Sequence, residues 1–262
     1  MTITIYPPEK QAVGNFDGGK ITELKPIGFP REGSAVKGIG PLFYWAWAHA
    51  KEEGHIPMHP HQAFEIITYM VNAQAEHSDT LGTRSIVTAG GLQVMQTGSG
   101  VSHSEKFIGP DSEGFQIWFE PHLREALQRK PTYNQYDHEA FPAFESAGLT
   151  VKTVIGEGSP VELVADVQMW DVELAGGISY NLKLEAGRSL AALAIRGHGS
   201  WTLAIEADKH PLHPFNHKDF TVIEAEGEQA EDVVLTAAAE GLRMILIEIP
   251  TEVDYPLYKN GR

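Results

Sequence analysis

The stretch Phe64-Glu-Ile-Ile-Thr-Tyr-Met-Val71 shows the pattern that decides the fold. It is a short apolar run, rich in β-branched and aromatic residues, which is typical of a buried β-strand. Similar runs recur along the whole chain, bounded by Gly, Pro, Asn or Asp, at 92–95, 114–119, 149–155, 169–174 and 190–195. This spacing predicts an all-β sandwich or barrel and argues against alternating strands and helices.

The pattern divides the chain into two similar halves. A segment at 121–130 has leucines at a four-residue spacing, which predicts a short helix that ends at Pro131. A polar stretch follows the helix, and strand-like runs then begin again. We therefore predict two domains, 1–145 and 146–262. The tail 250–262 has little periodicity and is expected to dock on the other half or to fray.

Composition narrows the classes of partner. The 262 residues carry 20 Lys and Arg against 35 Asp and Glu, a net charge of −15, without a basic cluster. Such a surface repels phosphate backbones and anionic lipid, so we expect neither a direct nucleic-acid partner nor a membrane partner. The absence of cysteine excludes disulfides and thiolate metal ligands. With neither a secretory signal nor a spanning segment expected, we predict a cytoplasmic protein, or a nuclear one in a eukaryote.

Two histidine motifs are the sharpest local feature, His59-Pro60-His61 and His103-Ser104-Glu105. In a β-strand, residues i and i+2 point to the same face, so each motif can present two side chains to one cavity. Antiparallel strands that return through turns at 79–82 and 90–91 can bring the second motif opposite the first. The pattern indicates a site of three imidazoles and one carboxylate.

Such a donor set suits divalent iron, manganese, nickel or zinc. Four protein ligands on an octahedral metal leave two positions, where dioxygen and a chelating substrate can bind. A closed tetrahedral zinc site is structural instead. The plain alternative for a single His-x-His is a pair of surface histidines, and Pro60 favours an edge strand or a loop. The second motif, in its glycine-rich context, favours the metal site.

The residues around both motifs resemble the pirin family of the cupin superfamily. The likeness rests on Phe64-Glu65 after the first motif and on Gly98-Ser-Gly-Val-Ser-His-Ser-Glu105 around the second. Further stretches similar to pirin segments are 76–82, 91–98, 114–118 and 130–133. The good resemblance covers about residues 55 to 133, and 196–201 and 241–247 are similar more weakly.

The resemblance implies a bicupin, two β-sandwich or jelly-roll barrels face to face, with a mononuclear iron in the N-terminal one. It places the metal ligands on His59, His61, His103 and Glu105. Fe(II) is therefore the metal that we predict, with Mn, Ni, Cu(II) or Zn as alternatives.

The C-terminal cupin domain is usually metal-free in pirins. The histidines of the second half lie in a proline-containing loop, and no His-x-Glu follows them at a matching distance. We therefore interpret His210, His213 and His217 as surface residues.

The chain departs from the family pattern close to the site. Gln62-Ala63 stands where pirins usually have Arg-Gly, and 91–95 lacks the usual Asp and Trp. The segment 43–50 lacks the usual Asp-His-Phe. The ligands are kept while the entrance is altered, so the resemblance specifies the metal better than the substrate.

Four aromatic residues precede the first motif, Phe43, Tyr44, Trp45 and Trp47. Such a cluster is most simply core or interface packing. Part of it can also wall the pocket of an aromatic substrate.

Other polar residues near the motifs have less specific interpretations. Glu65 follows His61 by four residues and would share its facing on an unbroken strand, so we expect it to orient an imidazole, to act in catalysis, or to be a plain strand carboxylate. Glu105 can itself act as a base by leaving the metal. His77 and Asp79 are expected to hydrogen-bond within their hairpin or to reach the cavity mouth.

The predicted function is that of a mononuclear iron dioxygenase of the quercetin 2,3-dioxygenase type, acting on a flavonol or a related aromatic. One alternative is a non-enzymatic protein whose iron state controls docking to a protein partner, as the resemblance to animal pirins implies. A second alternative is a cupin that holds a structural zinc.

Overall fold

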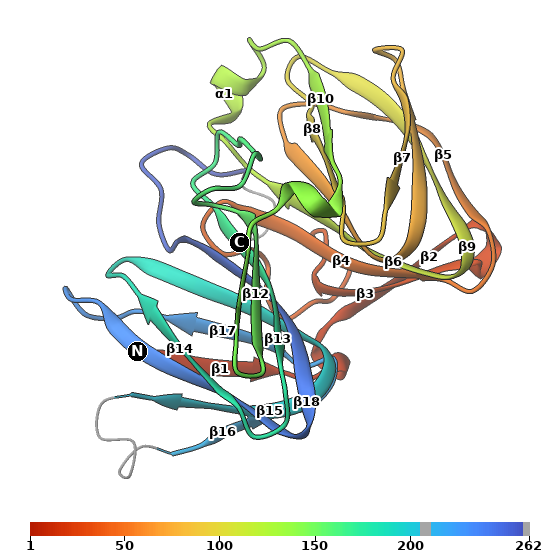
Figure 1. Cartoon of the computed structure of the whole chain (residues 1–262). Helices are drawn as coiled ribbons and strands as arrows, with labels where there is room; N and C mark the ends of the chain where they lie inside the picture. The colour runs from red at the N-terminus through yellow and green to blue at the C-terminus, as the bar shows by residue number, and fades with distance from the viewer. Residues whose placement is uncertain (205–210, 259–262) are drawn as a thin grey trace. The chain divides into compact units, whose positions relative to one another are not determined.

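The computed structural model describes residues 1–204 and 211–258, and these form two compact units, each built on one sheet (Figure 1). We call them the N-terminal sandwich and the C-terminal sandwich. The N-terminal sandwich consists of Gln11–Ala140, Pro160–Ala165 and the described residues from Asp254 onward. The C-terminal sandwich consists of Met1–Lys10, Phe141–Ser159 and Asp166–Val253. The all-β prediction is confirmed.

The N-terminal sandwich holds nine antiparallel strands among the described residues. They are β2 (Ala12–Phe16), β3 (Ile21–Ile27), β4 (Leu42–Ala50), β5 (Gly54–His61), β6 (Glu65–Asp79), β7 (Arg84–Thr88), β8 (Leu92–Gln96), β9 (Val101–Phe119) and β10 (Thr132–Tyr136). Their order is β10-β8-β6-β9-β4-β3-β2, with β5 on β9 and β7 on β6. The two longest strands, β6 and β9, therefore join the whole unit together.

The C-terminal sandwich likewise holds nine described strands. They are β1 (Thr2–Tyr6), β11 (Ala143–Ser146), β12 (Leu149–Ile155), β13 (Gln168–Leu174), β14 (Ser179–Leu184), β15 (Arg188–Leu203), β16 (His213–Phe215), β17 (Phe220–Glu224) and β18 (Glu231–Pro250). Their order is β1-β17-β15-β18-β13-β12-β11, with β14 on β18 and β16 on β15.

The chain exchanges segments between the two units. Strand β1 pairs with β17, so the first residues belong to the C-terminal sandwich. Residues 160–165 and the tail after Val253 belong to the N-terminal sandwich. The single division at residue 145 stays a prediction for the domains, and the compact units differ from it at these three segments.

Long strands bend so that one sheet can form two layers. Within β6, the segment 65–69 pairs with β8 and the segment 74–78 pairs with β7. Between these segments the register with β9 shifts, and Ala73 has a φ of 59°. A bulge of this kind bends a strand and increases its twist.

A comparable bend in the C-terminal sandwich depends on glycine. Gly197 in β15 and Gly241 in β18 have φ values of 72° and 81°. A Cβ atom on Gly197 would lie 2.0 Å from the carbonyl oxygen of Gly241. Only glycine permits both this backbone conformation and this close approach.

Helices are few and short among the described residues. The predicted helix at 121–130 is confined to one turn, α1 (Leu123–Ala126), and Leu127 is 36% exposed. The leucine spacing therefore does not correspond to a buried helical face. The remaining helical turns are η1 (Pro8–Lys10), η2 (Asp17–Gly19) and η3 (His138–Ala140). In the described ranges, no helix has the length and apolar character needed to cross a membrane.

Candidate metal centre

The two histidine motifs lie on neighbouring antiparallel strands. In the pairing of β5 with β9, His59 stands opposite His103, and His61 stands opposite Val101. A register shift between Ile56 and His59 sets this alignment. The prediction that returning strands bring the two motifs together is confirmed.

The imidazoles of His59, His61 and His103 form a compact cluster. One ring nitrogen of each lies within 4.8 Å of the others. The Nε2 atoms of His59 and His103 are 3.1 Å apart, and the ring centroids of the three pairs are separated by 4.5 to 4.8 Å. The cluster therefore presents three nitrogen donors toward one point.

Hydrogen bonding and burial prepare two of these rings for a metal. The Nδ1–H of His59 donates to the carbonyl oxygen of Pro57 at 2.8 Å, which leaves the Nε2 lone pair facing the cluster. The Nε2 atom of His61 is buried and has no hydrogen-bond partner among the described residues. A buried polar atom without a partner is costly, and a metal ion bound to the lone pair of this nitrogen would satisfy it. The donor set therefore fits a divalent transition metal.

The environment also keeps the rings of His61 and His103 neutral. Burial, together with the neighbouring His103 and His59, lowers the pKa of His61 to about 3. Burial likewise lowers the pKa of His103 to about 3, and His59 and His77 add to the effect. Neutral imidazole is the form that binds a metal, so no proton has to be displaced at these two rings near neutral pH.

Three uncharged side chains donate hydrogen bonds to the Glu105 carboxylate. Its side chain is 2% exposed. Oε1 accepts hydrogen bonds from the Thr68 hydroxyl at 3.0 Å and from the Gln93 amide at 3.3 Å, and Oε2 accepts one from the Gln116 amide. Glu105 is not a member of the three-histidine cluster. Its service as a fourth ligand stays a prediction.

Glu65 is held at a different place. Strand β5 ends at His61 and β6 begins at Glu65, so the unbroken strand on which the predicted shared facing depends does not form. The Glu65 carboxylate accepts hydrogen bonds from the backbone N–H groups of Val164 and Ala165, at 2.7 and 2.9 Å, and from the Gln96 amide. These contacts fix the loop 160–165. A role of Glu65 at the metal stays a prediction.

The predicted hydrogen bond between His77 and Asp79 is confirmed. His77 Nε2 lies 2.9 Å from Asp79 Oδ2, and the other carboxylate oxygen accepts the backbone N–H groups of Leu81 and Thr83. Asp79 therefore closes the hairpin between β6 and β7. The His77 ring lies 5.3 Å from that of His103, centroid to centroid, so this hairpin also borders the cluster.

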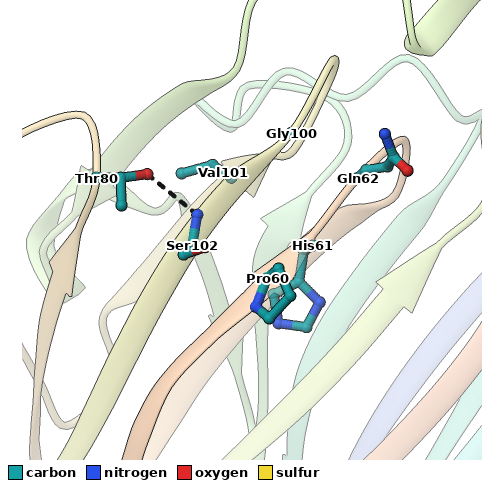
Figure 2. A pocket seen from close by; sticks show the side chains of 7 residues that line it. All are labelled: Pro60, His61, Gln62, Thr80, Gly100, Val101 and Ser102. Atoms are coloured by element: carbon teal, nitrogen blue, oxygen red, sulfur yellow. Dashed lines mark hydrogen bonds between the residues drawn. The ribbon is translucent and has the colours of Figure 1, made fainter.

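A pocket of about 460 Å³ opens beside His61 (Figure 2). Its wall is formed by Pro60, His61, Gln62, Thr80, Gly100, Val101 and Ser102. The backbone N–H of Ser102 donates to the Thr80 hydroxyl at 3.1 Å, which ties the two sides of the opening together. Gln62, the residue that departs from the usual arginine, therefore stands at this opening.

Sequence reasoning missed the polar residues that surround Glu105. Gln93 and Gln116 each stand within an apolar strand, in Leu92-Gln-Val-Met95 and Gly114-Phe-Gln-Ile-Trp118. Gln93 is 4% exposed, and its amide oxygen accepts a hydrogen bond from the Tyr133 hydroxyl at 3.0 Å. A glutamine inside an apolar run was the available signal for a buried polar network.

The histidines of the second half are placed only in part. His210 lies outside the described residues. His213 is half-buried at the start of β16, and His217 is exposed. The interpretation of this half as metal-free stays a prediction.

Comparisons with known proteins match the strands that carry the cluster. The family model Pirin matches residues 44–119. Pirin-like protein 2 from Arabidopsis thaliana is 26% identical over 196 residues, which cover 73% of this chain and 59% of the relative. Putative quercetin 2,3-dioxygenase PA1210 from Pseudomonas aeruginosa is 34% identical over 153 residues, 57% of this chain and 63% of the relative. The matches thus span about three fifths of the length of these two relatives.

Solved structures extend the likeness in fold to nearly the whole chain. Bacterial pirin YhhW from Escherichia coli, in complex with nickel(II), aligns with a TM-score of 0.74 and 20% identity and covers 96% of this chain and 100% of its own. Quercetin 2,3-dioxygenase from Acinetobacter baumannii aligns with a TM-score of 0.77 and 17% identity, covering 98% and 89%. The likeness to the pirin family thus covers the histidine-bearing strands in sequence, and nearly the whole chain in fold.

Proposed function

We propose that this protein is a metal-dependent dioxygenase of the quercetin 2,3-dioxygenase type, which acts on a flavonol or a related small aromatic. The observation that carries the proposal is the cluster of His59, His61 and His103, whose ring nitrogens lie within 4.8 Å of one another and whose member His61 also lines an open pocket. The relative PA1210 bears the name of this activity. Fe(II) is the metal that we propose, because its redox chemistry suits dioxygen.

The chain's own residues have distinct roles in this proposal. The three imidazoles hold the metal through their ring nitrogens, and Glu105 is the proposed fourth ligand. When bound, the metal supplies Lewis acidity and redox chemistry. Gln93 fixes the Glu105 carboxylate through a charge-assisted hydrogen bond, so that the carboxylate can serve as ligand or as base without reorganisation.

The pocket beside His61 offers polar groups that suit a polyphenol. Gln62 has both an amide donor and an amide acceptor at the opening. The Thr80 oxygen already accepts the Ser102 N–H, so its own proton can be donated to a substrate oxygen. These groups would orient substrate hydroxyls while the Pro60 and Val101 walls exclude water from one side.

Two measurements test the proposal. Protein purified without oxygen is analysed by mass spectrometry for metal content, with His59→Ala and Glu105→Ala beside the wild type. Oxygen consumption is then recorded with a panel of flavonols. We expect near-stoichiometric iron that is lost in His59→Ala, and oxygen uptake with at least one flavonol that follows the metal content.

The outcomes separate the alternatives. Absence of bound metal, or equal metal in wild type and His59→Ala, would remove the proposed metal centre. Stoichiometric iron without oxygen uptake would favour the regulatory function over the enzyme. Zinc that resists chelation, also without oxygen uptake, would favour a structural site.

A further inference from the structure

The N-terminal sandwich has a second pocket, of about 470 Å³, that the proposed reaction does not use. Its lining is almost wholly aromatic. The residues are Phe29, Pro30, Arg31, Phe43, Phe64, Trp118 and Tyr258. We call it the aromatic pocket. A pocket with aromatic walls and a single charged group is the usual form of a site for a small planar ligand.

The rings of this pocket are braced against one another. Phe29 stacks on Tyr44 at 4.3 Å and meets Trp118 edge-on at 5.1 Å. Phe43 and Phe64 lie 4.7 Å apart. Because each wall is supported by a neighbouring ring, the pocket is largely formed before a ligand enters.

The chain tail supplies one wall. The Tyr258 ring stands nearly perpendicular to those of Phe43 and Phe64, at 6.2 and 6.4 Å between centroids. The Tyr258 backbone N–H donates to the Glu120 carboxylate, and the Tyr255 hydroxyl donates to the Glu120 carbonyl oxygen at 2.8 Å. The expectation that the tail docks on the first half is confirmed, and its docking completes the pocket.

Arg31 gives the aromatic pocket its charge. It is exposed, and its side chain makes no ion pair or hydrogen bond to any residue that the structure describes. Its neighbour Glu32 is already engaged, since one carboxylate oxygen accepts Lys25 Nζ at 2.8 Å and the other accepts the Phe29 N–H. Within the described residues, no acidic group therefore neutralises this guanidinium, although the chain has a net charge of −15.

The aromatic pocket is separate from the histidine cluster. None of the three imidazoles lines the pocket, and Trp118 borders both sites, with its ring at 4.8 Å and 88° to that of His61. The same ring also meets Phe29 and Phe64, at 5.1 and 5.6 Å between centroids. A ligand in the aromatic pocket would contact Trp118 and would not reach the imidazoles.

We propose that the aromatic pocket binds a small planar aromatic carboxylate. The rings would stack on Phe43 and Phe64 or contact the edge of Trp118, and the carboxylate would pair with the Arg31 guanidinium. The net negative charge elsewhere disfavours non-specific binding of the same anion, so the preference for a carboxylate over a neutral group would come from Arg31. This binding does not depend on the function proposed above.

Isothermal titration calorimetry with 2-naphthoate and its neutral amide, 2-naphthamide, tests the proposal. The protein is used as purified and again after chelation. We expect 2-naphthoate to bind one to one, and about tenfold more tightly than the amide in both samples, since one charge-assisted contact is worth about this factor. His103→Ala protein should bind it equally well.

Variants locate the site. Arg31→Gln should remove the preference for the carboxylate and leave binding of the amide unchanged. Tyr258→Ala should weaken both ligands by a similar factor. Arg124→Gln, which removes an exposed arginine on α1, is the matched control and should change neither affinity.

Three outcomes would overturn the proposal. The first is wild-type protein without saturable binding of 2-naphthoate. The second is equal affinity for the acid and the amide. The third is binding that His103→Ala abolishes and Arg31→Gln does not, because the ligand would then occupy the histidine cluster.

Discussion

The two sandwiches are built on the same kind of sheet and fill their interiors differently. In the C-terminal sandwich, alternate residues of β18 that face the core are Leu242, Met244 and Leu246, all buried in one apolar cluster. In the N-terminal sandwich, alternate residues of β6 are Ile66, Thr68 and Met70, and the outer two belong to separate apolar clusters. A polar layer therefore interrupts the apolar interior of the N-terminal sandwich.

That polar layer is where the chemistry gathers. Thr68 donates to Glu105, and the Gln93 amide contacts both of them. Buried polar groups stabilise a fold less than apolar packing does, and they fix functional groups in one geometry. The comparison indicates that the C-terminal sandwich contributes mainly stability and the N-terminal sandwich mainly the site.

The largest expected effect is on the apolar core of the C-terminal sandwich. Leu246→Ala should lower the free energy of unfolding by about 3 kcal/mol, because it leaves a cavity in a close-packed core. Urea unfolding measures this loss. Metal content at low temperature should stay at the wild-type level. A variant that loses metal without losing stability would contradict the division of roles.

The next effect falls on the metal. His103→Ala should weaken metal binding by about 100-fold or more, since it removes one of three converging nitrogens. Competition with a chelator measures the affinity. His213→Ala, a half-buried histidine of the C-terminal sandwich, is the matched control and should bind metal as the wild type does.

A third variant distinguishes two roles of Glu65, which are fixing the loop 160–165 and acting at the metal. Glu65→Gln should lower the free energy of unfolding by about 2 kcal/mol, because an amide NH₂ would face the backbone donors of Val164 or Ala165. Thermal and urea unfolding at neutral pH check this. Unchanged stability together with lost metal would support the catalytic or metal-tuning role that the sequence predicts.

The smallest effect concerns the support of Glu105. Gln116→Leu removes a donor to the carboxylate and should reduce metal affinity about tenfold. It should leave the three imidazoles in place, which circular dichroism and the stoichiometry of binding can check. Gln128→Leu, at an exposed position, is the control. Equal affinities in all three proteins would show that Glu105 needs no such support.

The strands and the histidine cluster could be predicted because both depend on local periodicity. Alternation places His59 and His61 on one face, and tight turns at Asp79–Gly82 and Gly90-Gly91 return the chain to meet it. The partners of Glu105 and Glu65 could not be predicted in the same way. They come from strands and loops that meet only in the folded chain, and glutamine or a backbone N–H has no spacing rule.

The helix at 121–130 illustrates a further limit. Its leucine spacing fits a helical face, but Leu123 is only half-buried and Leu127 is 36% exposed. Without burial of an amphipathic face, a short helix gains little beyond its first turn. Pattern alone could not reveal what would cover it.

The exchange of segments between the sandwiches has a consequence for biosynthesis. Strand β1 leaves the ribosome early, yet its Thr2 pairs with Glu224. Glu120 likewise cannot accept its hydrogen bonds from Tyr255 and Tyr258 until these residues are translated, 135 and 138 residues later. The nascent chain must therefore keep β1 unpaired until β17 has been made, and keep the surface that Tyr258 covers open until 138 residues after Glu120 have been added.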